Sequence, residues 1–182
     1  MNWVDVESDI IRRNYSTLNN QLTLNEILKT ITSSDPIIIF PTYIYEKILT
    51  HLKSDLTTEL GGILTGNFFV DDDDKIKIIK IEDAVESRNY SSTGVSLSMN
   101  SDIWNDVNKI NDKNNSIVIG WYHSHPNLGA FFSATDRYTQ KHFFNNDYSL
   151  GLVIDPIREE EKYFLNKDSI EVCSKRVLKT YV

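Results

Sequence analysis

Residues 116–126 read SIVIGWYHSHP, and the apolar part of this run predicts a buried strand that ends in two histidines. Side chains of an extended segment alternate between its two faces, so His123 and His125 point the same way. Two imidazoles on one face can hold one metal ion, and zinc accepts histidine nitrogens. A bare His-x-His also occurs as a pair of structural histidines at a strand end, so the motif alone leaves both interpretations open.

Two further stretches carry groups that a catalytic zinc site needs. Residues 133–136 read SATD, in which Ser133 is a good helix N-cap and Asp136 can supply a third, carboxylate ligand. A water that zinc activates also needs a general base, and Glu59 stands just before two glycines that allow close backbone approach. Taken singly, these residues are also an ordinary helix start and an ordinary surface acid.

Helical and strand patterns alternate along the rest of the chain. The DDDDK run at residues 71–75 lies between two apolar runs and is interpreted as a solvated hairpin turn. Polar residues 111–115 are expected to end a helix, and the serine-rich residues 86–100 to form a long loop. Strands are predicted at 37–40, 62–70, 76–81, 116–122, 150–154, 162–165 and 170–173, and helices at 41–52, 103–110 and 133–144. This mixture predicts an α/β or α+β sandwich built on one sheet.

Residues 1–35 are predicted to be an N-terminal helical appendage. Residues 23–26 match a capping box, and apolar residues follow at helical spacing up to Ile31. Pro36 then stops the helix, because the residue before a proline avoids helical backbone angles. The remaining residues, 36–182, are predicted to form a single domain, as a total length of 182 residues allows.

Composition and charge exclude several classes of partner. Hydrophobic residues make up 40% of the chain and charged residues 25%, as in ordinary globular domains. A net charge of −7 gives no bulk attraction to nucleic acid or anionic lipid, and no apolar run approaches the roughly 20 residues of a membrane span. The N-terminus lacks a secretion signal, and the single cysteine, Cys173, is expected to be a buried, inert thiol. We therefore expect a cytoplasmic protein without nucleic-acid or membrane partners.

Together these pieces resemble the JAMM motif of the MPN+ (JAB-domain) zinc metalloproteases. The family pattern is a glutamate, then His-x-His-Pro, then Ser-x-x-Asp, and this chain matches it with Glu59, HSHP at 123–126 and SATD at 133–136. The GGILTG stretch at 61–66 and LVIDP at 152–156 also look like family sequence, so the resemblance covers residues 37–175. It implies a cytidine-deaminase-like JAB/MPN sandwich over residues 36–182, with a curved, mixed β-sheet flanked by helices.

The resemblance also implies a role for each matched residue. His123, His125 and Asp136 would bind one Zn²⁺ per chain, and Glu59 would be the general base. Ser133 would donate a hydrogen bond to the oxyanion of the tetrahedral intermediate. Ser124 fills the variable middle position of the motif and is assigned no chemistry.

Members of this family cleave isopeptide or peptide bonds after the C-terminus of ubiquitin or a ubiquitin-like protein. Residues 145–149 leave no room for a long second insertion of the kind that grips polyubiquitin, which favours a simpler ubiquitin-like protein as the partner. The Asn-, Ile- and Lys-rich composition indicates a bacterial source, and bacterial members occur beside E1-like and E2-like partners in antiviral defence operons. Two alternatives stay open: processing of a sulfur-carrier-like protein by the same fold, and a scaffold or docking role without catalysis.

Overall fold

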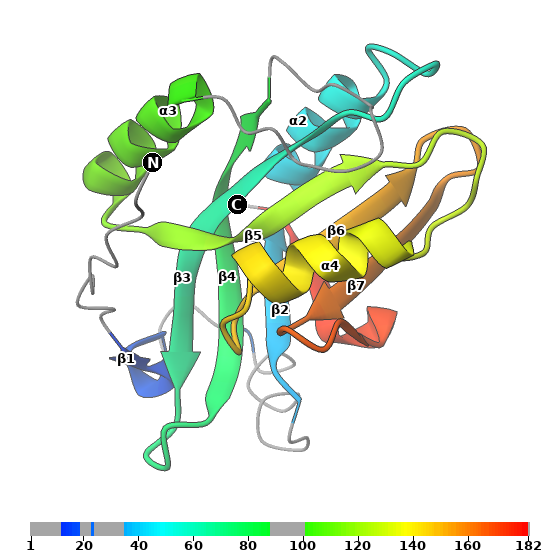
Figure 1. Cartoon of the computed structure of the whole chain (residues 1–182). Coiled ribbons are helices and arrows are strands. Elements are labelled where there is room, and N and C mark those ends of the chain that lie inside the picture. Colours follow the sequence, from blue (N-terminus) through cyan, green and yellow to red (C-terminus); the bar gives the residue numbers. More distant parts are fainter. Residues whose placement is uncertain (1–11, 19–22, 24–34, 88–100, 182) are drawn as a thin grey trace.

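The computed structural model describes residues 12–18, 23, 35–87 and 101–181, and one mixed sheet organises them (Figure 1). The strand order is β8-β7-β6-β5-β3-β4-β2-β9, and β1 pairs with β3 beside this path. The strands are β1 Arg13–Asn14, β2 Ile37–Pro41, β3 Gly61–Val70, β4 Ile76–Glu86, β5 Ile117–Ser124, β6 Leu150–Asp155, β7 Glu160–Leu165, β8 Ile170–Glu171 and β9 Val177–Thr180. The α-helices are α2 Thr42–Leu52, α3 Ser101–Asn114 and α4 Ala134–Phe143, and short 3-10 turns lie at Tyr15–Leu18 and Ser174–Arg176. This curled mixed sheet with flanking helices confirms the predicted fold class.

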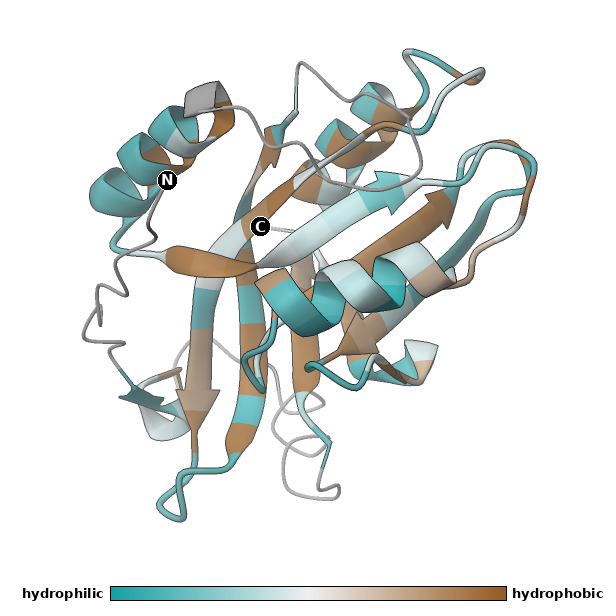
Figure 2. Ribbon diagram, in the orientation of Figure 1, coloured by the Kyte–Doolittle hydropathy of each residue, from teal (hydrophilic) through white to brown (hydrophobic). Residues whose placement is uncertain are grey.

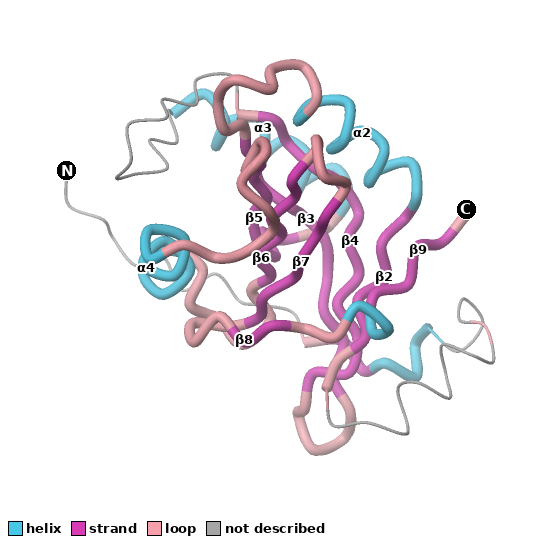
Figure 3. The backbone as a smooth tube through the Cα atoms, turned by 90° about the vertical axis from the view of Figure 1, so that its right-hand side faces the viewer, coloured by secondary structure: helices cyan, strands magenta, loops and turns pink. Residues whose placement is uncertain are grey.

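Both faces of the sheet are covered, because successive strand residues enter two different cores. In β3, Leu64 packs with α2 residues such as Ile48, whereas Ile63 packs with α3 residues such as Val107. All ten residues of β3 are buried, as expected for a strand covered on both sides. Figure 2 shows the central strands as largely hydrophobic, and in Figure 3 the strands stand between α4 and α2.

The same alternation runs along β5 and decides where its histidines point. Trp121 belongs to the core on the α3 side, and Tyr122 belongs to the core on the α2 side. His123 therefore shares a face with Trp121, and Ser124 shares the opposite face with Tyr122. Strand β5 pairs antiparallel with β3 and parallel with β6, so His123 lies inside the sheet, and His125 follows directly after the strand ends at Ser124.

Most predicted strands and helices are confirmed, and the differences lie at element ends. Helix α3 continues to Asn114, so the prediction that residues 111–115 break it was wrong; it ends where Asn115 takes a left-handed backbone angle, φ 52°. The predicted strand at 170–173 shrinks to β8, and Cys173 is exposed, which corrects its expected burial. The predicted helix after Thr23 and most of the predicted loop at 86–100 lie outside the described residues.

Part of the predicted N-terminal appendage lies against the sheet. Strand β1 pairs in parallel with β3, with Arg13 opposite Phe69. Leu18 is buried and packs in a small cluster with Ile37 and Ile78. The division of the chain at residue 35 stays a prediction. No helix in the described ranges is long and apolar enough to cross a membrane.

Candidate metal centre and active site

The end of β5 brings two histidines together in the interior. His123 has no exposed surface, and His125 is 3% exposed. His123 pairs with Gly61 of β3 on one side and Val153 of β6 on the other. The backbone N–H of His125 donates to the carbonyl of Ile154 at 2.9 Å. The backbone that carries the two imidazoles is therefore held by hydrogen bonds to its neighbours.

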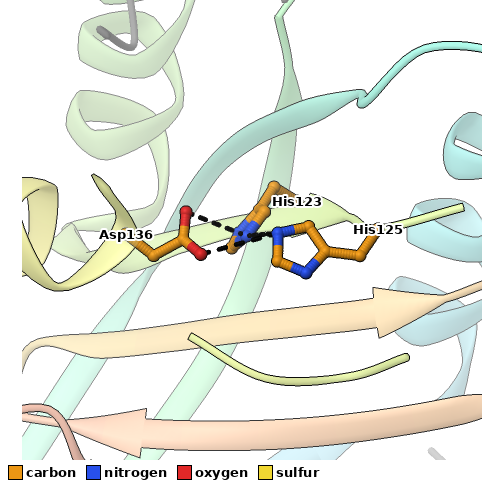
Figure 4. A group of neighbouring side chains, drawn as sticks. All are labelled: His123, His125 and Asp136. Carbon is orange, nitrogen blue, oxygen red and sulfur yellow. Dashed lines mark hydrogen bonds and ion pairs between the residues drawn. The ribbon is translucent and has the colours of Figure 1, made fainter. Parts of the chain in front are cut away.

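Helix α4 begins at the same place and supplies a carboxylate. Ser133 is its N-cap, as predicted, and a complete capping box forms with Asp136. The backbone N–H of Ser133 donates to Asp136 Oδ2 at 2.6 Å, and the N–H of Asp136 donates to Ser133 Oγ at 3.2 Å. This reciprocal bonding holds the Asp136 carboxylate on the first turn, pointing at both histidines (Figure 4).

The donor atoms of His123, His125 and Asp136 lie close enough together to bind one metal ion. The two Nε2 atoms of His123 and His125 are 3.2 Å apart. Asp136 Oδ1 lies 3.3 Å from Nε2 of His123, and Oδ2 lies 3.5 Å from Nε2 of His125. Zinc bonds of about 2.0–2.2 Å at tetrahedral angles put neighbouring donor atoms about 3.3 Å apart. The buried His-His-Asp group of this structure thus fits a zinc ion.

The charges in this group favour an ionised carboxylate. Burial alone would raise the pKa of Asp136, but hydrogen bonds from His123 and His125 and their charge hold it well below its usual value. Burial alone would lower the pKa of His125, but the hydrogen bond and charge of Asp136, with a contribution from Glu59, raise it overall. The group thus combines two imidazoles with an ionised carboxylate, a donor set that suits zinc.

Glu59 lies beside the histidines on the exposed side of the group. Its Oε1 atom is 3.7 Å from Nε2 of His125, and its side chain is 36% exposed. Glu59 precedes β3, whose first residue, Gly61, is paired with His123. All five residues singled out from the sequence therefore come from three segments that meet at one end of β5.

Aromatic rings surround the histidines. The indole of Trp121 stacks on the ring of His123, with centroids 4.5 Å apart and an interplanar angle of 7°. Phe132 lies on the same side, and the half-exposed ring of Phe131 packs against His125 at 4.9 Å. Gln140 of α4 accepts from Trp121 Nε1 at 2.7 Å. The aromatic run at 131–132 was a visible signal, but its orientation depends on the tertiary fold.

Asp155 is a second buried carboxylate, behind the loop that follows His125. It is fully buried, and four backbone N–H groups donate to it, those of Asn127, Gly129, Ile157 and Arg158. Burial opposes ionisation, but these bonds hold the pKa of Asp155 below its usual value. This carboxylate joins the loop after β5 to the loop after β6, next to the metal centre.

Comparison with known proteins identifies the family and relatives that this chain resembles. Residues 41–162 match the family of prokaryotic homologs of the JAB domain. Saccharomyces cerevisiae ubiquitin carboxyl-terminal hydrolase RPN11 is 32% identical over 117 residues, 62% of this chain and 36% of that protein. The 26S proteasome non-ATPase regulatory subunit 14 of Caenorhabditis elegans is also 32% identical over 117 residues, 62% of this chain and 34% of that protein. The chain thus matches about a third of the length of these curated relatives.

A solved structure resembles the fold as a whole. The solution structure of protein DSY2949 from Desulfitobacterium hafniense superposes with a TM-score of 0.61 at 24% identity. The superposition covers 80% of this chain and 94% of that one, which supports the fold. Since the family match spans more than half of its residues, this chain belongs to the prokaryotic JAB-domain family.

Proposed function

We propose that this protein is a zinc-dependent isopeptidase or peptidase that cleaves after the C-terminal tail of ubiquitin or a ubiquitin-like protein. The observation that carries the proposal is the convergence of the His123, His125 and Asp136 donors, with Oε1 of Glu59 3.7 Å from Nε2 of His125. Relatives at 32% identity include a protein named as a ubiquitin carboxyl-terminal hydrolase, which supports the substrate class.

Each polar residue has one task in the proposed reaction. His123, His125 and Asp136 would hold the zinc ion, which when bound would polarise the scissile carbonyl and lower the pKa of water toward neutrality. Glu59 accepts a proton from the attacking water and passes it to the leaving amine. The Ser133 hydroxyl accepts the Asp136 N–H, so its own proton stays available for the oxyanion.

Exposed apolar side chains lie at the same end of the sheet as the site. Phe131 lies against His125, and the backbone N–H of Leu128 donates to the His125 carbonyl at 3.1 Å. Leu128, Phe131 and Ile157 all keep about half of their surface exposed, so they form an apolar rim at this end of the sheet. The connection from α4 to β6 is short, which favours a single ubiquitin-like protein over linkage-selective cleavage of polyubiquitin. E1-like and E2-like proteins are the further partners of this proposal.

Cleavage of purified fusion proteins tests the proposal. Ubiquitin and a sulfur-carrier-like protein, each fused through its C-terminus to a reporter protein, are incubated with the zinc-loaded chain. We expect cleavage at the fusion junction, loss of cleavage with a chelator, and recovery on adding Zn²⁺. Metal analysis should give about one zinc per chain. A folded protein that binds no zinc contradicts the proposal.

A matched pair of variants tests the role of Glu59. Glu59→Gln keeps the shape of the side chain but cannot accept the proton, so we expect turnover to fall about 10²–10⁴-fold with zinc retained. Glu171→Gln is the control, because Glu171 lies on β8 and forms an exposed ion pair with Lys162. Equal turnover by Glu59→Gln and the wild type removes Glu59 from the mechanism.

A further inference from the structure

We propose that Ser124 is the positioning residue that holds the general base Glu59 at the metal centre. The inference rests on the proposed function, in which Glu59 accepts the proton. Ser124 stands between the two histidines, and its side chain points to the opposite face of β5. It has no exposed surface. The hydroxyl therefore contacts neither metal nor substrate, and it acts through another residue.

The contact partner of Ser124 is the peptide group that follows Glu59. The hydroxyl Oγ accepts the backbone N–H of Leu60 at 2.9 Å. The backbone N–H of Ser124 donates to the Leu60 carbonyl at 2.8 Å. Leu60 is thus bound on both sides, one residue before β3 begins. Because the Leu60 N–H belongs to the peptide that joins it to Glu59, this bond fixes the backbone at Glu59.

Glu59 needs this backbone hydrogen bond at Leu60, because its carboxylate is not held in place by a hydrogen bond of its own. Among the described residues its nearest polar partner is His125, at 3.7 Å, which is longer than a hydrogen bond. The residues just before Gly61 form no helix or strand, and the Glu59 side chain is partly exposed. A general base must reach its proton within about 2.6–3.2 Å. The position of Glu59 therefore depends on its backbone, and so on Ser124.

The alternation of side chains along β5 explains how this strand can carry the two histidines and also position Glu59. His123 and His125 project to the α4 side, and Ser124 projects to the α2 side, where the end of the 56–60 segment passes. The distance between the proposed metal centre and the Glu59 carboxylate then depends on β5 alone. A hydroxyl at position 124 keeps that hydrogen bond, and a methyl group there leaves the Leu60 N–H without its acceptor.

Variants of Ser124 in the full-length, zinc-loaded protein test this role. We expect Ser124→Ala to keep its zinc and to leave KM within about twofold, while kcat falls roughly 10–100-fold because the base is displaced. Ser124→Thr keeps the hydroxyl and should restore kcat. The control is Ser116→Ala: Ser116 is also buried, precedes the other end of β5 and donates to Asn111 at 3.1 Å. It should change neither constant.

Two further measurements separate positioning from general damage. The Leu60 amide should exchange its hydrogen at least about tenfold faster in Ser124→Ala than in the wild type. In a Glu59→Gln background, Ser124→Ala should cause no additional loss of turnover, because the group it positions is already gone. If Ser124→Ala does not fold, Ser124→Cys replaces it, because a thiol is a weaker hydrogen-bond acceptor than a hydroxyl. We expect Ser124→Cys to change kcat and the Leu60 exchange rate in the same direction, by a smaller factor.

The outcomes distinguish this inference from the proposed function. Unchanged exchange of the Leu60 amide overturns the inference, whatever the protein cleaves. A full additional loss of turnover in the Glu59→Gln background also overturns it. A wild-type protein that cleaves no fusion, but shows the faster Leu60 exchange in Ser124→Ala, refutes the proposed function and leaves the tie between Ser124 and Leu60 established.

Discussion

The buried carboxylate of Asp155 offers a sharp test of what stabilises the end of the sheet that carries the candidate metal centre. Its Oδ1 accepts the N–H groups of Asn127, Ile157 and Arg158 at 2.9–3.1 Å. Its Oδ2 accepts the N–H of Gly129 at 2.7 Å. The substitution Asp155→Asn changes one oxygen to an NH₂ group without changing the size of the side chain, so it isolates the charge and one acceptor.

The expected loss can be worked out from these four bonds. The asparagine carbonyl can keep the three donors on one side, and its NH₂ group then faces the Gly129 N–H, donor against donor. A hydrogen bond to a charged group contributes about 1.5–3 kcal/mol, and a buried donor left unpaired costs about 1–3 kcal/mol. We expect the free energy of unfolding to fall by about 3 kcal/mol. For a chain of this length that lowers Tm by about 6–12 °C.

The effect should also depend on pH, with a definite sign. The pKa of Asp155 is lower in the folded than in the unfolded state, so its charge stabilises the fold above the unfolded pKa, about 3.9. That contribution is lost as the pH falls through the folded pKa. The difference in stability between wild type and Asp155→Asn should therefore be full at pH 7 and shrink below about pH 4.

Urea unfolding of the chelator-treated proteins, followed by the fluorescence of buried Trp121, measures this difference. Asp71→Asn is the control, because Asp71 also accepts two backbone N–H groups but lies partly exposed in the β3–β4 turn. We expect a clearly smaller loss than for Asp155→Asn. If Asp155→Asn is no more destabilising than Asp71→Asn, the burial of the carboxylate does not stabilise this end of the sheet.

Two other substitutions probe the packing beside the metal centre. In Gly120→Ala the new Cβ would lie 1.8 Å from the carbonyl oxygen of Leu150, so β5 and β6 must separate. We expect the free energy of unfolding in urea to fall by roughly 3 kcal/mol or more. A fall of less than about 1 kcal/mol would contradict the close approach of the two strands. Trp121→Phe keeps a ring on His123 but removes the N–H that donates to Gln140. We expect thermal unfolding to show a loss of about 1–3 kcal/mol in stability, with the zinc content unchanged. An unchanged Tm would show that this hydrogen bond does not stabilise the fold.

The sequence predicts the interior of the fold well, because buried strands are continuous apolar runs. It predicts the ends of long strands and the short strands less well. The second half of β4 contains Glu82 and Asp83, which interrupt the apolar pattern, yet the strand continues because Asp83 pairs with Thr65 of β3. Strand β9 was not predicted: it is four residues long and exists because it pairs with β2, some 140 residues earlier in the chain.

The same distinction applies to the candidate site. The paired direction of His123 and His125 follows from strand alternation, and the Ser133–Asp136 capping box is local, so both are readable from spacing. Their meeting in space, and the approach of Glu59, depend on how β3 and α4 pack onto β5. The roles of Ser124 and Asp155 could not be predicted, because each acts through a hydrogen bond to a segment 26 or more residues away.

Packing and hydrogen bonds hold three parts of the proposed centre. Trp121 stacks on His123, the capping box fixes Asp136, and the Asp155 carboxylate secures the loop after His125. Strands β5 and β6 are parallel neighbours, so His125 and Asp155, which lie at their carboxyl ends, meet at the same edge of the sheet. Side chains held in this way need little rearrangement to take up a metal ion. The separations of 3.2–3.5 Å between the donor groups therefore follow from the strand pairing, the capping box and the ring packing of the folded chain.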